Sequence, residues 1–221
     1  MSRACVFLFR QEEPMDPGSR LLAAARAYLA QKDSPVPPER LDAGRDGKSP
    51  GEEWQVVKTG RGKPYFLRRP QLRFSISHSE EWWGCAFLES EIGLDIQKHT
   101  RFRHESWEEA DRRLGRMAER FFHPREAAYV DGRHARFFRI WAAKESYVKY
   151  TGQGIGDDFG EFSVLPEEME GALPLRWRGA GACFHEIEYP EAYTICVCAE
   201  KERECALYTC TGPAFRRQSI F

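Results

Sequence analysis

Short apolar runs separated by polar turns make up most of the hydrophobic pattern of this chain. Residues 5–9 form an apolar run typical of a buried strand, and residues 72–76 alternate apolar and polar side chains with the period of a half-buried strand. The same reasoning predicts further strands at 54–58, 84–88, 92–96, 162–164, 175–177, 183–188 and 193–198. Short strands are therefore expected along the whole chain.

Four helices are predicted between these strands. Residues 20–31 are rich in alanine and leucine, and residues 105–122 have the spacing of a charged amphipathic helix. Pro124 can open a short helix, because proline is tolerated in the first helical turn. The longest pattern predicts a helix over 134–151, which Gly152 ends.

Two segments lack a regular pattern. Residues 33–53 are rich in proline, glycine and charge, so they are expected to form a long surface connection with one helical turn around 38–41. The tail 211–221 has no clear periodicity. The prediction is an α+β fold of two similar α/β half-domains in a pseudo-twofold arrangement, each a small antiparallel sheet packed with helices. The half-domains are placed at 1–92 and 93–210.

Composition excludes several classes of protein. The 221 residues are 42% hydrophobic and 30% charged, which is typical of a globular chain. The net charge of −1 gives no overall basic field for nucleic acid or a membrane surface. Seven cysteines without a CxxC pair are expected to be small hydrophobic residues in a reducing environment. No apolar run suits a signal peptide or a membrane span, so a soluble cytoplasmic protein is expected.

A carboxylate and a lysine lie one helical turn apart in the segment WAAKESYVK at 141–149. Glu145 and Lys149 share one side of the predicted helix, and the simplest interpretation is an exposed ion pair worth about 0.2–0.5 kcal/mol. The neighbours Trp141 and Val148 indicate instead that this side is partly buried. A buried charge must be paired or bound to a metal, because leaving it alone costs several kcal/mol.

A second carboxylate, Asp95, interrupts the apolar strand GLDIQ at 93–97. Alternation along the strand would also let Asp95 face solvent. Together with Glu145 and the amide oxygen of Gln97, however, it supplies the oxygen donors that Mg²⁺ prefers, alongside water and phosphate. The lysines next to Glu145 favour a substrate that carries phosphate, so an enzyme is the leading hypothesis.

A glycine-containing turn at 59–64 offers further cations. Arg61 and Lys63 lie beside glycines that allow close backbone approach, and His78 follows the strand at 72–76. These side chains could contact phosphate. The turn lacks the pattern GxxxxGK[ST], which excludes a nucleotide triphosphatase of the P-loop class.

Five segments taken in order resemble one known family. They are GKPY at 62–65, FSISHS at 74–79, GLDIQ at 93–97, RFFHPRE at 120–126 and WAAKESYVK at 141–149. This series is similar to the 4′-phosphopantetheinyl transferases of the monomeric, surfactin-synthetase-activating type. That resemblance implies transfer of the phosphopantetheine arm of coenzyme A to a serine of an apo carrier protein, with Mg²⁺ as cofactor and 3′,5′-ADP as product.

The resemblance also implies roles for individual residues. Asp95 and Glu145 would bind Mg²⁺, with Gln97 at the position of the second acid in the family's Asp-x-Glu motif. This departure removes one negative charge, which implies weaker Mg²⁺ binding or a water at that position. Lys149 would stabilise the pyrophosphate, and Glu126 would help to deprotonate the incoming serine. The residues predicted to contact coenzyme A are Arg61, Lys63, His78, Lys144 and Lys149.

The implied partners are coenzyme A and an apo acyl or peptidyl carrier protein of fatty acid, polyketide or non-ribosomal peptide biosynthesis. Carrier proteins are generally acidic around their serine, so a basic docking patch is expected. Arg112, Arg113 and Arg116 are candidates for it, or they are simply arginines on a solvated helix face. A monomer is expected, because one chain holds both halves of the site.

Two other interpretations stay open. Gln97 would suit a non-catalytic module that binds coenzyme A or 3′,5′-ADP and has lost part of its metal site. A metal-dependent phosphohydrolase, in which water replaces the serine, is less favoured because the sequence has no His- and Asp-rich cluster for two metals.

Overall fold

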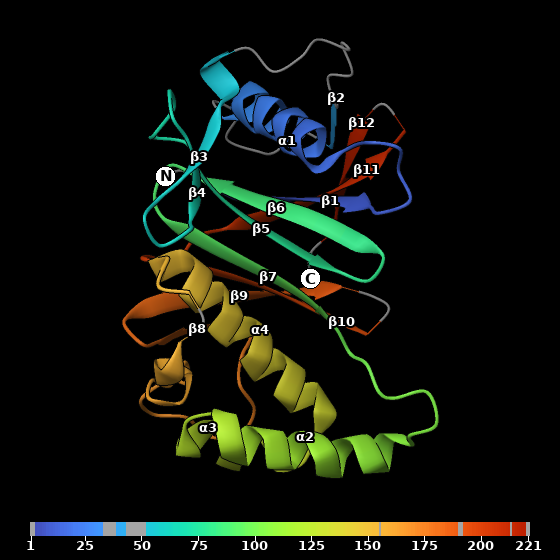
Figure 1. Ribbon diagram of the computed structural model, residues 1–221, viewed down its shortest axis with the longest axis vertical. Helices are drawn as coiled ribbons and strands as arrows, with labels where there is room; N and C mark the ends of the chain where they lie inside the picture. Colours follow the sequence, from blue (N-terminus) through green and yellow to red (C-terminus); the bar gives the residue numbers. More distant parts are fainter. Residues whose placement is uncertain are drawn as a thin grey trace.

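The computed structural model describes residues 3–32, 39–42, 52–154, 156–189, 192–212 and 214–219. Its helices are α1 (Pro17–Gln31), α2 (Trp107–Phe121), α3 (Pro124–Val130) and α4 (His134–Thr151), with 3₁₀ turns η1 (Glu52–Trp54) and η2 (Asp157–Gly160). Its strands are β1 (Ala4–Arg10), β2 (Arg40–Asp42), β3 (Val56–Lys58), β4 (Pro64–Phe66), β5 (Arg73–Ser79), β6 (Trp82–Leu88), β7 (Ile92–Lys98), β8 (Arg176–Gly179), β9 (Ala182–Tyr189), β10 (Tyr193–Ala199), β11 (Cys205–Thr211) and β12 (Ala214–Gln218). Helix α1 covers the upper sheet in Figure 1, and α4 lies against the lower one.

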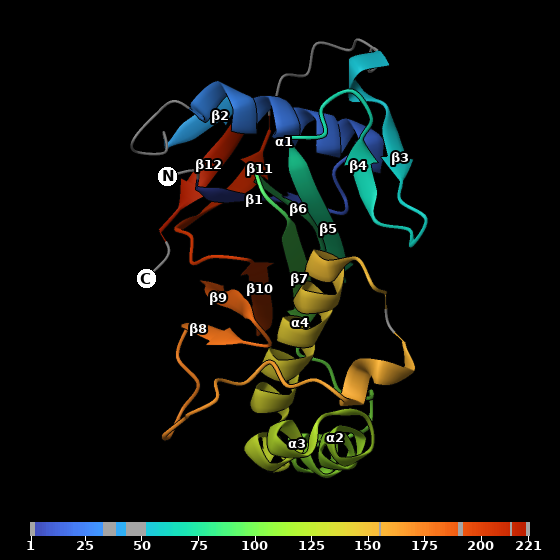
Figure 2. The ribbon, with the colours of Figure 1, turned by 90° about the vertical axis from the view of Figure 1, so that its left-hand side faces the viewer.

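The strands form two main sheets. The larger sheet has six strands in the order β2-β12-β11-β1-β6-β5, and the smaller has four in the order β7-β10-β9-β8. Strand β1 is parallel to β11 and antiparallel to β6, whereas every pair in the smaller sheet is antiparallel. Strands β12 and β8 lie on one side of the molecule, and β5, β7 and α4 lie on the other (Figure 2).

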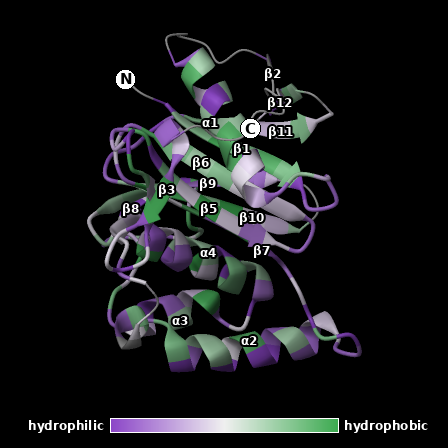
Figure 3. Ribbon diagram, turned by 45° about the horizontal axis from the view of Figure 1, so that its top comes forward, coloured by the Kyte–Doolittle hydropathy of each residue, from purple (hydrophilic) through white to green (hydrophobic). Residues whose placement is uncertain are grey.

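Three buried layers hold these elements together. Phe7, Phe87 and Tyr208 belong to a layer between α1 and the larger sheet. Val6 and Ile195 belong to a second layer between the two sheets. A third layer fills the space between the smaller sheet and α2, α3 and α4. Hydrophobic colours accordingly gather on the central strands, whereas α2 alternates between hydrophobic and hydrophilic positions (Figure 3).

Local sequence explains where the helices begin and end. At α2, the Ser106 side chain accepts a hydrogen bond from the backbone N–H of Glu109, and the Glu109 carboxylate accepts one from the N–H of Ser106. This reciprocal arrangement satisfies two donors that the first helical turn leaves without partners. Helix α4 ends at Gly152, whose φ of 70° is a left-handed conformation that glycine adopts without strain.

The predicted α+β class, with sheets packed against helices, is confirmed. The smaller sheet is antiparallel as predicted, whereas the larger one also contains the parallel pair of β1 and β11. The helix predicted over 134–151 has those bounds. The half-domains at 1–92 and 93–210 stay a prediction, and the sheets follow them only in part. Strand β11 lies in the predicted second half but pairs with β1.

Several local predictions were wrong. The described residues 162–164 form no strand, and Arg40–Asp42 is strand β2 instead of part of a helical turn. The rest of that turn, with most of 33–53, lies outside the described residues. Strand β11 was missed because it is buried on both faces and shows no alternation, and β12 because arginines follow Phe215.

None of the described helices is long and apolar enough to span a membrane. All seven cysteines are free thiols.

Serine side chains join the two sheets where β5 meets β7. Ser75, Ser77 and Ser79 alternate along β5, and their hydroxyl oxygens accept hydrogen bonds from the backbone N–H groups of Leu94, Ile96 and Lys98 at 2.9, 3.1 and 3.0 Å. These two strands are edges of different sheets, so the serines take the place of a backbone ladder. We call this contact between β5 and β7 the serine seam.

Candidate functional site

Close packing of α4 on β7 brings the two predicted acids together. A Cβ atom at Gly93 would lie 1.8 Å from the backbone oxygen of Ser146 and 2.6 Å from the nitrogen of Tyr150. Only glycine therefore allows the helix backbone to approach the strand this closely. Asp95 follows two residues later on β7, and Glu145 lies on the facing part of α4.

Asp95 is the centre of a buried polar cluster at the serine seam. Its carboxylate oxygen Oδ1 accepts hydrogen bonds from Ser77 Oγ at 2.8 Å and from Lys149 Nζ at 2.7 Å. Lys149 Nζ also lies 3.0 Å from Ser77 Oγ, which accepts the N–H of Ile96 as well. The Ser77 hydroxyl therefore uses its donor and both acceptor sites, which fixes the orientation of the Asp95 carboxylate.

Glu145 is the second carboxylate of this cluster. It is buried, and it makes no side-chain hydrogen bond or ion pair with the residues that the structure describes. Burial and the nearby Asp95 carboxylate raise the pKa of Glu145, against the opposing effect of Lys149. Burial also raises the pKa of Asp95, although Lys149 and Ser77 oppose that shift. Both acids would hold their negative charge more readily beside an additional cation.

The donor atoms in this cluster fit a divalent cation. Asp95 Oδ2 is buried without a hydrogen-bond partner, which is a costly state for a carboxylate oxygen. Together with Glu145 it offers two hard oxygen donors, and Mg²⁺ commonly takes one or two carboxylates and fills its other positions with water and phosphate. Within the described ranges, no group of three or more histidine, cysteine or acidic side chains could hold a metal. That result agrees with an amide at Gln97.

Gln97 lies two residues beyond Asp95 on the same face of β7. Its side-chain Nε2 donates to the backbone oxygen of Lys98 at 3.0 Å. The residue is half-buried and lines a cavity of about 260 Å³ with Phe102, Arg113 and Trp141 among its walls. Its predicted part in metal binding stays a prediction.

A second cavity, of about 200 Å³, opens beside Lys149. Arg61 and Lys63 line it from the turn before β4, and Phe74 and Ile76 line it from β5. Lys63 Nζ donates to the backbone oxygen of Tyr150 at 2.6 Å and pairs with Glu91 at 2.5 Å. The Lys63 ammonium is therefore held at the C-terminal end of α4, at the edge of this cavity.

His78 is exposed and lies beyond this cavity on the same face of β5 as Phe74 and Ile76. Its neighbour Ser77 points to the opposite face, toward Asp95. The structure thus brings Asp95, Glu145 and Lys149 into one cluster and leaves His78 outside it.

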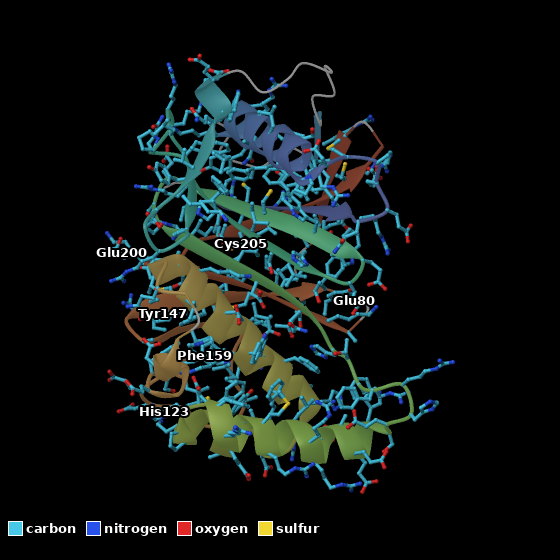
Figure 4. The ribbon with its side chains drawn as sticks, in the orientation of Figure 1. Glu80, His123, Tyr147, Phe159, Glu200 and Cys205 are labelled. Atoms are coloured by element: carbon cyan, nitrogen blue, oxygen red, sulfur yellow. The ribbon has the colours of Figure 1, made fainter. Side chains whose placement is uncertain are left out.

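Glu126 and Lys144 form a separate, fully buried ion pair. Lys144 Nζ donates to Glu126 Oε2 at 2.8 Å and to the backbone oxygen of Phe162 at 2.7 Å, and it lies 3.9 Å from the centre of the Phe162 ring. The other oxygen of Glu126 accepts the N–H of Val164 at 2.7 Å. Phe159 and His123, labelled in Figure 4, lie in this same region below Tyr147.

These contacts do not fit the roles predicted for the pair. Both side chains are 0% exposed, so Glu126 cannot take a proton from an incoming serine and Lys144 cannot reach coenzyme A without opening the core. Burial also lowers the pKa of Lys144. The two groups instead join α3, α4 and residues 162–164, which is a structural role.

The arginines predicted for a docking patch are largely paired within α2 and the loop before it. Arg112 binds Glu108 at 2.9 Å, and Arg113 binds both oxygens of Glu105. The guanidinium of Arg113 also lies over the ring of Phe102. Their charge is therefore partly neutralised.

Sequence reasoning missed Ser77 and Glu91 as members of the site. Ser77 was recognisable in principle, since serines at every second position of an otherwise apolar strand must find partners when buried. Glu91 lies in a polar turn, and nothing in its sequence neighbourhood indicates the contact with Lys63.

The chain resembles known proteins over the part that carries this cluster. Residues 91–198 match the family described as the 4′-phosphopantetheinyl transferase superfamily. Over these residues the chain is similar to this superfamily. The matched residues include β7 and α4, and therefore all of the acids and the lysine of the Asp95 cluster.

Individual relatives carry the same description. A 4′-phosphopantetheinyl transferase of Bacillus subtilis is 32% identical over 145 residues, which cover 62% of this chain and 59% of the relative. A 4′-phosphopantetheinyl transferase of Bacillus pumilus is 30% identical, over 69% of this chain and 63% of the relative. An L-aminoadipate-semialdehyde dehydrogenase-phosphopantetheinyl transferase of Xenopus laevis is 31% identical over 131 residues. The chain thus spans less than two thirds of the length of these relatives.

Proposed function

We propose that this protein transfers the 4′-phosphopantetheine arm of coenzyme A to a serine hydroxyl of an apo carrier protein. The observation that carries the proposal is the cluster of Asp95, Glu145 and Lys149, in which one buried carboxylate oxygen has no partner. The family supports the same activity, because its relatives are described as phosphopantetheinyl transferases.

The reaction exchanges one phosphorus–oxygen bond for another. The serine oxygen forms a bond to the β-phosphorus of coenzyme A, and the bond from that phosphorus to the bridging oxygen breaks, so 3′,5′-ADP leaves with the electron pair. Mg²⁺, when bound by Asp95 and Glu145, would offset the negative charge that builds up on the pyrophosphate. The Lys149 ammonium would act on the same charge, since it lies beside Asp95.

Other residues of the chain would bind the substrate and move a proton. Arg61 and Lys63 would contact the phosphates of coenzyme A from the edge of the 200 Å³ cavity. His78 would extend that contact along β5. The serine proton would go to solvent, because a Glu145 carboxylate that binds Mg²⁺ is a poor proton acceptor. Glu126 has no part in this proposal, because it is buried in an ion pair.

The wider predictions belong to the same proposal. The carrier would be an acyl or peptidyl carrier protein, the protein would act in the cytoplasm as a monomer, and neither nucleic acid nor a membrane would be its partner.

One assay tests the proposed activity against its main alternative. The protein is incubated with Mg²⁺, coenzyme A and a panel of apo carrier proteins, and intact-mass spectrometry follows the gain of one phosphopantetheine arm. We expect transfer to at least one carrier, release of an equal amount of 3′,5′-ADP, and loss of both when a chelator removes Mg²⁺.

The other outcomes are equally informative. Binding of coenzyme A without transfer to any carrier would favour the non-catalytic binding module, for which the amide at Gln97 is the structural reason. Release of nucleotide in the absence of a carrier would favour a phosphohydrolase.

A further inference from the structure

A large polar cavity lies at the edges of the two sheets that face away from the serine seam. It has a volume of about 800 Å³ and is lined by β2, β11 and β12 of the larger sheet, by β8 of the smaller one, and by Arg3 just before β1. Strand β8 is at the opposite end of its sheet from β7, and β12 and β2 are at the opposite end of theirs from β5. Figure 2 shows these two sides of the molecule. We call this cavity the arginine groove.

Arginine dominates the lining of this groove. The arginines are Arg3, Arg40, Arg176, Arg216 and Arg217, and the acids that line the same space are Glu39 and Glu204. The whole chain has 33 basic and 34 acidic residues, so this excess of positive charge is local. The groove therefore has a positive field that the net charge of the protein conceals.

Two of these arginines face each other across the paired strands β2 and β12. Arg40 on β2 and Arg216 on β12 are direct partners in the antiparallel register, so their side chains leave the same face of the sheet. Both are exposed, and neither makes an ion pair with the residues that the structure describes. Like charges directly opposite one another are destabilising, and a bound anion would reverse that effect.

The other members of the groove extend the same surface. Arg3 binds Glu204 at 2.9 Å, which holds its guanidinium at the edge of the cavity. Arg176 comes from the smaller sheet and lies 4.0 Å from Glu202, longer than a good ion pair. An anion bound here would therefore contact cations from both sheets.

We propose that the arginine groove binds a polyphosphate anion, at a site separate from the Asp95 cluster. Each guanidinium can donate two parallel hydrogen bonds to one phosphate group. A single carboxylate would meet only one such fork, whereas a chain of phosphates can bridge Arg40, Arg216 and Arg176. The volume of about 800 Å³ is in the range of ordinary ligand sites, so a small polyphosphate or the phosphates of a nucleotide can enter.

Inorganic triphosphate is the probe that tests this proposal. Without Mg²⁺ the carboxylates of Asp95 and Glu145 repel phosphate at the serine seam. Titration calorimetry on the full chain under this condition is therefore expected to find one bound triphosphate. The double variant Arg40→Ala/Arg216→Ala is expected to weaken Kd about tenfold or more, because charge-assisted hydrogen bonds contribute strongly to such binding. The matched variant Arg68→Ala/Arg133→Ala removes two equally exposed arginines, 60% and 62%, and is expected to bind as the parent does.

A third variant separates this site from the catalytic one. Lys149→Ala is expected to leave triphosphate binding unchanged, since Lys149 belongs to the serine seam. No binding to the parent chain, equal Kd in the Arg40/Arg216 variant, or loss of binding in Lys149→Ala would each overturn the proposal. Thermal unfolding of every variant checks that the fold is retained, and the result does not depend on whether phosphopantetheine transfer occurs.

Discussion

The two sheets are joined by hydrogen bonds on one side of the molecule and are separated by a cavity on the other. At the serine seam, β5 and β7 are tied together by side-chain hydrogen bonds, and α4 covers the contact. At the arginine groove, β12 and β8 stay apart and leave a cavity of about 800 Å³. The serine seam buries the acids Asp95 and Glu145, whereas the arginine groove is lined by five arginines.

This difference determines what each side can do. Buried carboxylates have lost most of their hydration, so a nearby cation interacts with them strongly and specifically. Exposed arginines stay in contact with water, so an anion is bound there through several forked hydrogen bonds and not through one strong buried pair. We therefore expect chemistry at the seam and binding alone at the groove.

The largest effect is expected from removing the charge of one seam acid. Glu145→Gln keeps the shape of the side chain but removes a carboxylate beside Asp95. Transfer activity should fall about 100-fold or more, because a lost metal contact removes several kcal/mol of charge stabilisation. Initial rates of holo-carrier formation measure this.

The matched control for that change is Glu119→Gln, an exposed acid on α2 outside both sites. It should retain the parent rate. A near-normal rate in Glu145→Gln would show that the seam acids are structural and would remove the contrast between the two sides.

A smaller effect is expected from the serines of the seam. Ser77→Ala and Ser79→Ala each remove one acceptor of a backbone N–H, so both should lose about 1 kcal/mol of stability. Only Ser77 also contacts Asp95 and Lys149. Ser77→Ala should therefore need about 10-fold more Mg²⁺ for half-maximal rate, as when an outer partner of a metal ligand is lost.

Measurement of rate against Mg²⁺ concentration separates the two variants. If Ser77→Ala and Ser79→Ala change the Mg²⁺ requirement equally, Ser77 acts only in joining the sheets. If Ser77→Ala lowers the rate at saturating Mg²⁺ without changing the requirement, its hydroxyl acts on substrate rather than on Asp95.

The two sides also differ in how far the sequence predicts them. Asp95, Glu145 and Lys149 were recognisable because charged residues interrupt strongly apolar patterns, and a buried charge needs a partner. The helix of Glu145 has the predicted bounds because its periodicity is long and Gly152 ends it. Local patterns of this strength depend little on the rest of the chain.

The arginine groove was not predictable in the same way. Strand β11, near the end of the chain, pairs with β1, and β12 pairs with β11. Local sequence patterns do not indicate which distant strands pair. The prediction for Glu126 shows the same limitation. Its motif predicted a role in deprotonating the serine, whereas its carboxylate is held in the core by Lys144 and the N–H of Val164. Contacts between distant segments decide both cases.

The smallest expected effects are on stability, and they distinguish the two sides by pH and by salt. Burial raises the pKa of Glu145 above its ordinary value of 4.5, so the folded chain holds this proton more tightly than the unfolded chain does. Stability is therefore lost as pH rises from about 4.5 through the raised pKa. Glu145→Gln removes that penalty and should be more stable than the parent at pH 7, with the advantage disappearing below about pH 4.5.

Arg216→Gln supplies the comparison from the groove. It removes the like charge opposite Arg40 and should stabilise the protein by about 0.2–1 kcal/mol at low salt. Arginine stays protonated throughout this range, so the gain should not change between pH 4 and pH 7, whereas added salt should screen it. Urea unfolding of both variants across pH and NaCl concentration measures these differences. A salt-sensitive, pH-independent gain in Glu145→Gln would mean that its carboxylate is effectively at the surface, and the contrast between a buried acidic seam and an exposed basic groove would then be lost.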